Sequence, residues 1–325
     1  MPERALCRLP ARAPVPDRRE NLPIFSGSGP EVGIAEGPLR PDSSLSAAIQ
    51  TWGEDLEDSG RSINTVKAFT GDLRLLARFM GAGHSISSIG THDLRNFLDW
   101  MLNRRGVPCS PKTFSRRVTS LKAFFRWLTH AGVLGEDPAA PIPQESVLSP
   151  LPEVLTQDEL LAVLKAAEEM RQKDPPDARP FTLVSLLLHT AIKKSECLGI
   201  HLNHVDLKSA EGPLLWVRYG DVSKRYRERK LLLEASWIPA YKAYLKRYDP
   251  SERLFPYSPR RLEYLLEDVG RDAGLEKHLS FNMCRWTSAL TDYKSGMDKD
   301  SLRQKLGISK IQWREVGMKL DRLAA

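Results

Sequence analysis

The segment SPKTFSRRVTSLKAFFRWLTHAG, residues 110–132, decides the fold of the first half of the chain. Its apolar residues recur every three or four positions, and a glycine at its end is typical of a helix C-terminus. The spacing predicts an amphipathic helix that packs one face against other elements. That face carries Val118, Leu121, Phe125 and Leu128.

Three segments before it show the same spacing. Residues 44–60, 62–83 and 91–106 carry apolar residues at helical intervals, and each ends in glycine. Four amphipathic helices with short loops predict a compact helical bundle. We expect its aromatic residues in the core rather than as stacking platforms for a ligand. The apolar faces of the first two helices carry Leu45, Ile49, Trp52, Leu56, Val66, Phe69, Leu73, Leu76 and Phe79.

Positive charge gathers in the last part of this bundle. The chain has 48 Lys and Arg against 41 Asp and Glu, a net charge of +7. Residues 101–130 contain seven of these cations and no acidic residue, which predicts a surface facing nucleic-acid phosphates. A solvated basic face without a ligand is the alternative. The seven cations are Arg104, Arg105, Lys112, Arg116, Arg117, Lys122 and Arg126.

Composition divides the chain into two domains. Residues 1–43 are rich in Pro, Gly, Ser and Arg without apolar periodicity, so we predict that they are disordered. Residues 136–152 contain five prolines and are predicted to be a linker. The first domain then covers 44–135 and the second 153–325.

The second domain is predicted to be mostly helical with a small sheet. Thr156 and Glu159 form a capping box at the start of a helix. Residues 181–200 are almost wholly apolar, which predicts a single buried helix. Three short β-prone runs follow at 205–207, 213–220 and 227–233. Further helices are predicted at 236–248, 259–274, 283–296, 301–307 and 310–323.

Several classes of protein are excluded by the sequence. No apolar run is long enough to span a membrane, and the N-terminus has no apolar stretch typical of a secretory signal. The four cysteines, at 7, 109, 197 and 284, form no CxxC pair. We therefore expect no metal site, no cofactor and a cytoplasmic, nucleoid-associated location.

The order of these elements resembles the tyrosine recombinase, or phage integrase, family. Residues 63–80 and 113–142 are similar to the second and fourth helices of the family's DNA-binding domain and the exit from it. Residues 151–167 resemble the start of its catalytic domain, and 190–207 resemble the helix that carries its first catalytic arginine. The resemblance covers about residues 44–325. It implies duplex DNA as partner and metal-free strand cleavage by a tyrosine, with two arginines stabilising the phosphate and a lysine protonating the leaving oxygen.

The first two catalytic positions implied by the resemblance are altered. The family phrase T-G-L-R-x-S-E becomes Thr190-Ala191-Ile192-Lys193-Lys194-Ser195-Glu196, so Lys193 replaces an arginine and loses the bidentate phosphate contact. At the position of the sheet lysine the chain has Arg227, whose pKa is too high for a proton donor. Lys224 is the alternative residue for that role.

The remaining catalytic positions are also altered, except one. The family phrase H-x-x-R becomes Asn282-Met283-Cys284-Arg285, which keeps only Arg285. The histidine of L-G-H becomes Ile308, and nine residues later Gly317 stands where the tyrosine belongs. Because glycine disfavours helix, the helix is expected to be frayed or broken there. No tyrosine follows Tyr293, which we interpret as a packing residue.

The sequence therefore predicts a catalytically inactive relative of the recombinases that binds duplex DNA as an accessory or architectural factor in recombination or integration. An active recombinase with a displaced nucleophile and a protein–protein scaffold without DNA binding remain alternatives. Self-association through the helix 310–323, or contact with other recombinase subunits, is expected. The predicted DNA-binding residues of the second domain are Lys193, Lys194, Lys224, Arg227 and Arg285, with Arg225 and Arg229 adding charge.

Overall fold

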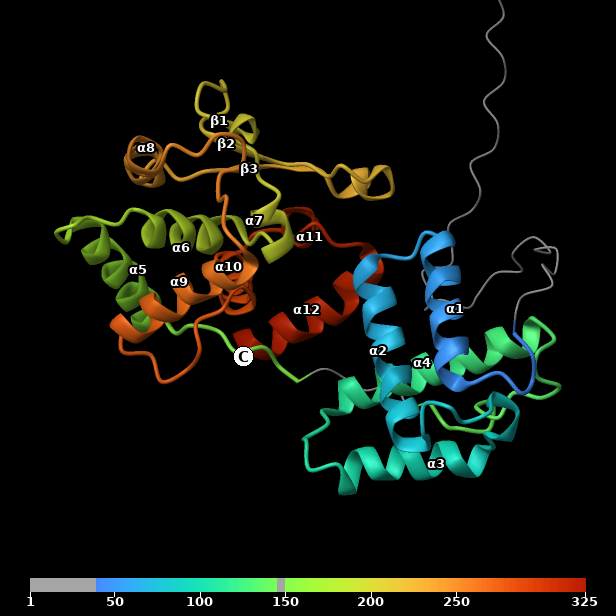
Figure 1. Cartoon of the computed structure of the whole chain (residues 1–325). Helices are drawn as coiled ribbons and strands as arrows, with labels where there is room; N and C mark the ends of the chain where they lie inside the picture. The colour runs from blue at the N-terminus through green and yellow to red at the C-terminus, as the bar shows by residue number, and fades with distance from the viewer. Residues whose placement is uncertain (1–38, 145–149) are drawn as a thin grey trace, which may run out of the picture. The chain divides into compact units, whose positions relative to one another are not determined.

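The computed structural model describes residues 39–144 and 150–325, and the chain divides into two compact units between residues 149 and 150 (Figure 1). Most of the segment predicted to be disordered, residues 1–38, lies outside the described residues. Each unit has a hydrophobic core of its own.

The first unit is a helical bundle, as predicted. Ser44, Ser62 and Ser110 each begin a helix by accepting a hydrogen bond from a backbone N–H of the first turn. The elements are α1 (Leu45–Asp58), α2 (Ile63–Met80), the 3-10 turn η1 (Ile86–Ser88), α3 (Thr91–Asp99), its π-helical continuation η2 (Trp100–Arg104) and α4 (Pro111–His130).

Aromatic side chains fill the centre of this bundle. Trp52 stacks on Phe69 with the ring centroids 5.9 Å apart, and meets Phe124 edge-on at 5.4 Å. All three are buried, so the predicted core role of the aromatic residues is confirmed. The core also includes Ala139 and Ile142, from the predicted linker. The packed part of the first unit thus extends beyond residue 135.

The second unit is mostly helical with one small sheet. Its three antiparallel strands lie in the order β1-β2-β3, with Val205 opposite Leu215 and Val217 opposite Arg229. The elements are α5 (Gln157–Gln172), α6 (Arg179–Thr190), α7 (Lys194–Leu198), η3 (Leu202–His204), β1 (Val205–Asp206), β2 (Leu214–Val217), η4 (Val222–Arg227), β3 (Arg229–Leu232), α8 (Trp237–Tyr248), α9 (Pro259–Asp272), α10 (Phe281–Lys294), α11 (Lys299–Leu306) and α12 (Lys310–Ala324).

Two local predictions in this unit are wrong. The predicted single helix 181–200 is two helices, because α6 ends at Thr190 and Ala191 turns the chain at φ 52° before α7 begins. The helix predicted to fray at Gly317 is continuous from Lys310 to Ala324. Packing explains its continuity, since Leu320 is buried in a cluster with residues of α10 and α11. Among the described residues, no helix is long and apolar enough to cross a membrane.

Candidate nucleic-acid interface

A buried ion pair holds the second unit together beside the sheet. Arg229 of β3 donates two hydrogen bonds to the Glu196 carboxylate of α7, at 3.0 and 3.1 Å, and its Nε donates to the Lys305 carbonyl at 2.7 Å. The two charged side chains are only 8% and 1% exposed. This bidentate geometry ties β3, α7 and the end of α11 together (Figure 1).

Neighbouring residues form close contacts with this ion pair. Burial pushes the pKa of Glu196 up, but Arg229, the Lys193 backbone N–H and the Tyr219 hydroxyl outweigh burial and leave the pKa lowered. Burial and the bond to Glu196 raise the pKa of Tyr219 to about 12. At Gly307 a Cβ would lie 2.5 Å from a guanidinium nitrogen of Arg229. Only glycine fits there, also because its φ is +58°.

Lys193 lies next to this pair with its amine unpaired. Its backbone N–H donates to Glu196 at 2.8 Å, whereas its Nζ has no hydrogen-bond or ion-pair partner within the described part of the chain. Burial, together with the charges of Arg285, Arg227 and Arg229, lowers the pKa of Lys193 to about 8 against the opposing charge of Glu196. The structure therefore brings four cations together, which we call the cationic cluster: Lys193, Arg227, Arg229 and Arg285.

Arg285, the one catalytic-type residue kept in the sequence, is part of this cluster. It projects from α10 and donates to the carbonyls of Ala191 and, at 2.6 Å, Leu306. Burial, followed by the charge of Arg229, lowers its pKa to about 10 despite the opposing effect of Glu196. Arg285 thus fixes the turn after α6 and the end of α11 at the edge of the cluster.

The other predicted catalytic positions supply no acid, base or nucleophile. Asn282 is exposed in the first turn of α10, and Ile308 packs against the C-terminal apolar cluster. Gly317 lies within α12, where an added Cβ would be 3.5 Å from the Trp313 indole. The Tyr293 hydroxyl donates to Asp321 of α12, which raises the pKa of this tyrosine. Its predicted packing role fits that contact.

The hairpin between β2 and β3 carries Lys224 and Arg227. Lys224 pairs with Asp221 at 2.7 Å. Arg227 lies over the Tyr226 ring at 5.0 Å and donates to its hydroxyl at 2.9 and 2.6 Å. Lys194, also predicted to bind DNA, forms an ion pair with Glu263 at 2.6 Å. Of the predicted second-domain cations, Lys193 is thus half-buried with an amine that has no hydrogen-bond or ion-pair partner among the described residues.

The basic segment of the first unit differs from the prediction at its centre. Arg116 contacts the buried Asp72 at 2.5 Å, and Arg117 lies 3.5 Å from the same carboxylate with its side chain only 13% exposed. Ser120 also donates to Asp72, at 2.9 Å. Arg116 and Arg117 therefore stabilise the bundle, and Arg117 is too buried to face DNA. Sequence analysis missed this because Asp72 lies on α2, far upstream.

The other cations of that segment lie nearer the surface. Arg104 is 61% exposed and pairs with Asp99 at 2.5 Å. Lys122 donates to the Ala140 carbonyl at 3.0 Å. Lys112 is exposed in the first turn of α4, and Arg105 and Arg126 are half-buried.

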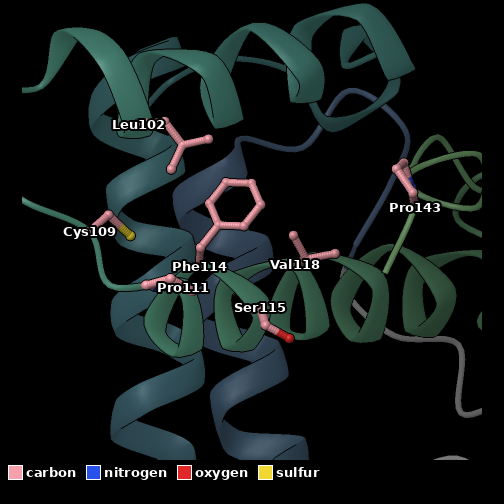
Figure 2. Close-up of a pocket in the computed structure, with 7 residues that line it drawn as sticks. All are labelled: Leu102, Cys109, Pro111, Phe114, Ser115, Val118 and Pro143. Carbon is pink, nitrogen blue, oxygen red and sulfur yellow. The ribbon is translucent and has the colours of Figure 1, made fainter. Parts of the chain in front are cut away.

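An apolar cavity of about 280 Å³ in the first unit was not predicted (Figure 2). Leu102 faces Phe114 and Val118 across it, and Cys109 and Pro143 lie at its sides. None of the predicted site residues lines it. No group of His, Cys, Asp and Glu in the described residues is suited to hold a metal ion.

Matches to known protein families fall on either side of the boundary between the two units. Residues 153–314 match the phage integrase family, and residues 49–132 match the phage integrase N-terminal SAM-like domain. Tyrosine recombinase XerC of Mycobacterium tuberculosis (strain ATCC 25177 / H37Ra) is 36% identical over 149 residues, 45% of this chain and 49% of the relative. The chain thus spans about half the length of such relatives. Tyrosine recombinase XerD of Listeria innocua is 22% identical over 273 residues, 80% of this chain and 89% of the relative.

Solved structures share the fold. XerH recombinase bound to palindromic difH substrate, in its post-cleavage complex, has a TM-score of 0.67 at 16% identity, covering 86% of this chain and 82% of XerH. A lambda integrase dimer bound to a COC' core site has a TM-score of 0.66 at 15% identity, covering 84% and 77%. The two family matches, which cover both units, show that this chain belongs to the phage integrase, or tyrosine recombinase, family.

Proposed function

We propose that this protein binds duplex DNA through the cationic cluster without cleaving it, and acts as an accessory factor in recombination. The observation that carries the proposal is the unpaired amine of Lys193, a half-buried residue among like charges at the position of a phosphate-binding arginine. A cation whose pKa is lowered in this way gains stability when an anion arrives. A DNA phosphate supplies that charge.

The absence of cleavage is proposed on chemical grounds. Gly317 has no side-chain oxygen to attack phosphorus, the Asn282 amide exchanges no proton near neutral pH, and the Ile308 side chain has no hydrogen-bond donor. Tyr293 is a poor substitute nucleophile, since its hydroxyl is engaged by Asp321 and its pKa is raised. These features favour binding over the alternative of an active recombinase with a displaced nucleophile.

We infer that the partners include other recombinase subunits. The lambda integrase structure named above is of a dimer on DNA, which motivates this inference. In the present structure Leu320 of α12 is buried against its own chain, whereas Ile311 and Met318 are 54% and 53% exposed. Self-association through the helix 310–323 therefore uses the side of α12 that carries Ile311 and Met318.

The binding step is tested with adjacent lysines as variant and control. Lys193→Gln removes the unpaired amine, and Lys194→Gln removes the same charge from the neighbouring residue, whose amine is paired with Glu263. In gel-shift titrations across salt, we expect K193Q to weaken duplex binding about tenfold and to reduce the salt slope by about one. Equal affinities of K193Q and K194Q would remove the cluster from the interface.

The cleavage step is tested in the same titrations with nicked suicide substrates, and an active tyrosine recombinase serves as positive control. We expect no covalent adduct with the wild type, nor with Gly317→Tyr, because the general acid and the hydrogen-bonding partners are missing as well. A phosphotyrosyl adduct mapped to Tyr293 or another tyrosine would establish the active-recombinase alternative. Undetectable binding of duplex at low salt would favour the scaffold.

A further inference from the structure

The outward face of the small sheet is hollowed into a cavity of about 820 Å³. Side chains of adjacent strand residues point to opposite faces, so Trp216 faces away from the core in which Leu215 is buried. Lys230 stands directly opposite Trp216 on β3, and Arg218 follows two residues later on the chain. The guanidinium of Arg218 and the amine of Lys230 each lie 5.1 Å from the Trp216 ring.

The turn before the sheet and the hairpin complete the walls. His201 and His204 of the turn have ring centroids 5.2 Å apart, and Arg225 comes from the hairpin. Gly220 lines the cavity, and a Cβ added to it would have no atom within 4 Å beyond those of Gly220 and its chain neighbours. The cavity is therefore lined by an indole, two imidazoles and cations.

Positive charge in this cavity is only partly compensated. Lys230 pairs with Glu211 at 3.1 Å, and Glu228 accepts a hydrogen bond from a backbone N–H. The guanidinium groups of Arg218 and Arg225 have no acidic partner among the residues that the structure describes. Burial lowers the pKa of His204, and the charges of His201 and Arg218 lower it further, with Glu228 opposing. An anion in the cavity would relieve this crowding of cations.

We propose that this cavity binds a nucleotide, with Arg218 and Arg225 holding its phosphate and Trp216 and the histidines contacting its base. Its volume far exceeds that of a phosphate ion and lies in the range typical of small-molecule sites. An aromatic group beside unpaired guanidinium groups matches a ligand that carries both a ring and a phosphate. The ligand is either a nucleotide within a DNA strand or a free nucleotide.

This site is separate from the cationic cluster. Arg229 lies at the boundary of both, but its guanidinium is engaged by Glu196 on the core side of the sheet. Tyr219 likewise directs its hydroxyl to Glu196. The proposal therefore goes beyond the proposed function and does not depend on Lys193.

The test measures binding to the full-length protein by calorimetry with two probes: ATP, for a free nucleotide, and a short single-stranded oligodeoxynucleotide, for a strand. Arg218→Gln combined with Arg225→Gln removes the phosphate contacts. Lys242→Gln combined with Lys246→Gln removes equal charge from exposed positions of α8 and serves as control. Gly220→Leu fills the cavity wall without changing charge.

We expect saturable binding of at least one probe, weakened about tenfold or more in both cavity variants and less than about twofold in the control. The His204 imidazole resonances should show a raised pKa in the complex, because the anion favours the charged ring. Binding of ATP assigns the site to a free nucleotide, whereas binding of the oligonucleotide alone assigns it to a strand. Binding of neither probe, equal loss in the control, or an unchanged His204 titration would overturn the proposal.

Discussion

Each unit of the molecule buries a carboxylate among arginines, and the two arrangements leave different cations available. In the first unit Asp72 forms ion pairs with both Arg116 and Arg117, the arginines at the centre of the basic segment. In the second unit Glu196 is held by Arg229, while Lys193 beside it keeps an unpaired amine. A cation's role in binding thus depends on acidic partners that are distant in sequence.

The largest expected effect is on the Glu196 pair. Glu196→Ala leaves Arg229 buried without its carboxylate and beside other cations, so we expect a loss of about 3–5 kcal/mol in the free energy of unfolding. Glu263→Ala breaks the exposed pair with Lys194 and should cost less than about 1 kcal/mol. Urea unfolding of both variants measures the difference. Similar losses would show that the buried pair is not what stabilises this unit.

A smaller effect, with opposite pH dependence, is expected at Asp72. Burial raises the pKa of Asp72 above its ordinary value of 3.8, although Ser120, Arg116 and Arg117 oppose this effect. Folding therefore favours the protonated carboxyl. The contribution of Asp72 to stability increases as the pH falls through its raised pKa towards 3.8. The pKa of Glu196 is lowered below 4.5, so its contribution is lost as the pH falls through that lowered value.

Asp72→Asn and Glu196→Gln, compared with the wild type in urea unfolding at several pH values, test these signs. The destabilisation caused by E196Q should shrink towards acidic pH, whereas the destabilisation caused by D72N should grow as the pH falls through the raised pKa of Asp72. The same sign of pH dependence in both variants would contradict the assigned pKa directions.

The next largest effect is expected at two glycines, whose replacement by alanine should change the stability in opposite directions. Gly317→Ala places a methyl in ordinary contact with Trp313 inside α12, and we expect it to stabilise the protein by about 1 kcal/mol. Gly307→Ala meets Arg229 at 2.5 Å with φ +58°, and should cost at least about 1–2 kcal/mol. Thermal unfolding distinguishes them. A destabilising G317A would mean that α12 is not the continuous helix described.

The smallest effect is expected at the surface pair of Arg104 and Asp99. Asp99→Asn removes a partner that is 50% exposed, so the stability should change by less than about 1 kcal/mol. Freed from that partner, Arg104 should bind duplex DNA no less tightly than in the wild type. A weakened gel shift for D99N would show that Asp99 positions Arg104 for its phosphate contact.

The fold was largely predictable because apolar spacing and capping residues report local structure. The apolar spacing of residues 110–132, the capping box of Thr156 and Glu159, and the β-prone run 213–220 placed helices and a strand that the structure contains. The break at Ala191 was not predicted, because no glycine or proline marks it and an alanine adopts the left-handed turn there.

The site was less predictable because it depends on contacts between distant residues. Lys193 and Arg285 were found from the family phrases, and the structure brings them together. The role of Arg229 was missed, since its partner Glu196 precedes it by 33 residues. The available signal was a carboxylate directly before the apolar residues Cys197 and Leu198, because a buried charge requires a partner.

The anchoring of Arg229 bears on the entropy of ligand binding. Its bonds to Glu196 and the Lys305 carbonyl fix the base of the β2–β3 hairpin before any ligand arrives. Only the outer turn, the 6 residues Val222–Arg227, is left to adjust to a bound strand. Ordering backbone costs about 1–2 kcal/mol per residue, so a preformed base confines that loss to a short segment. The hairpin can therefore change conformation at its tip, which includes Arg227, while Lys193, Arg229 and Arg285 of the cationic cluster keep their geometry.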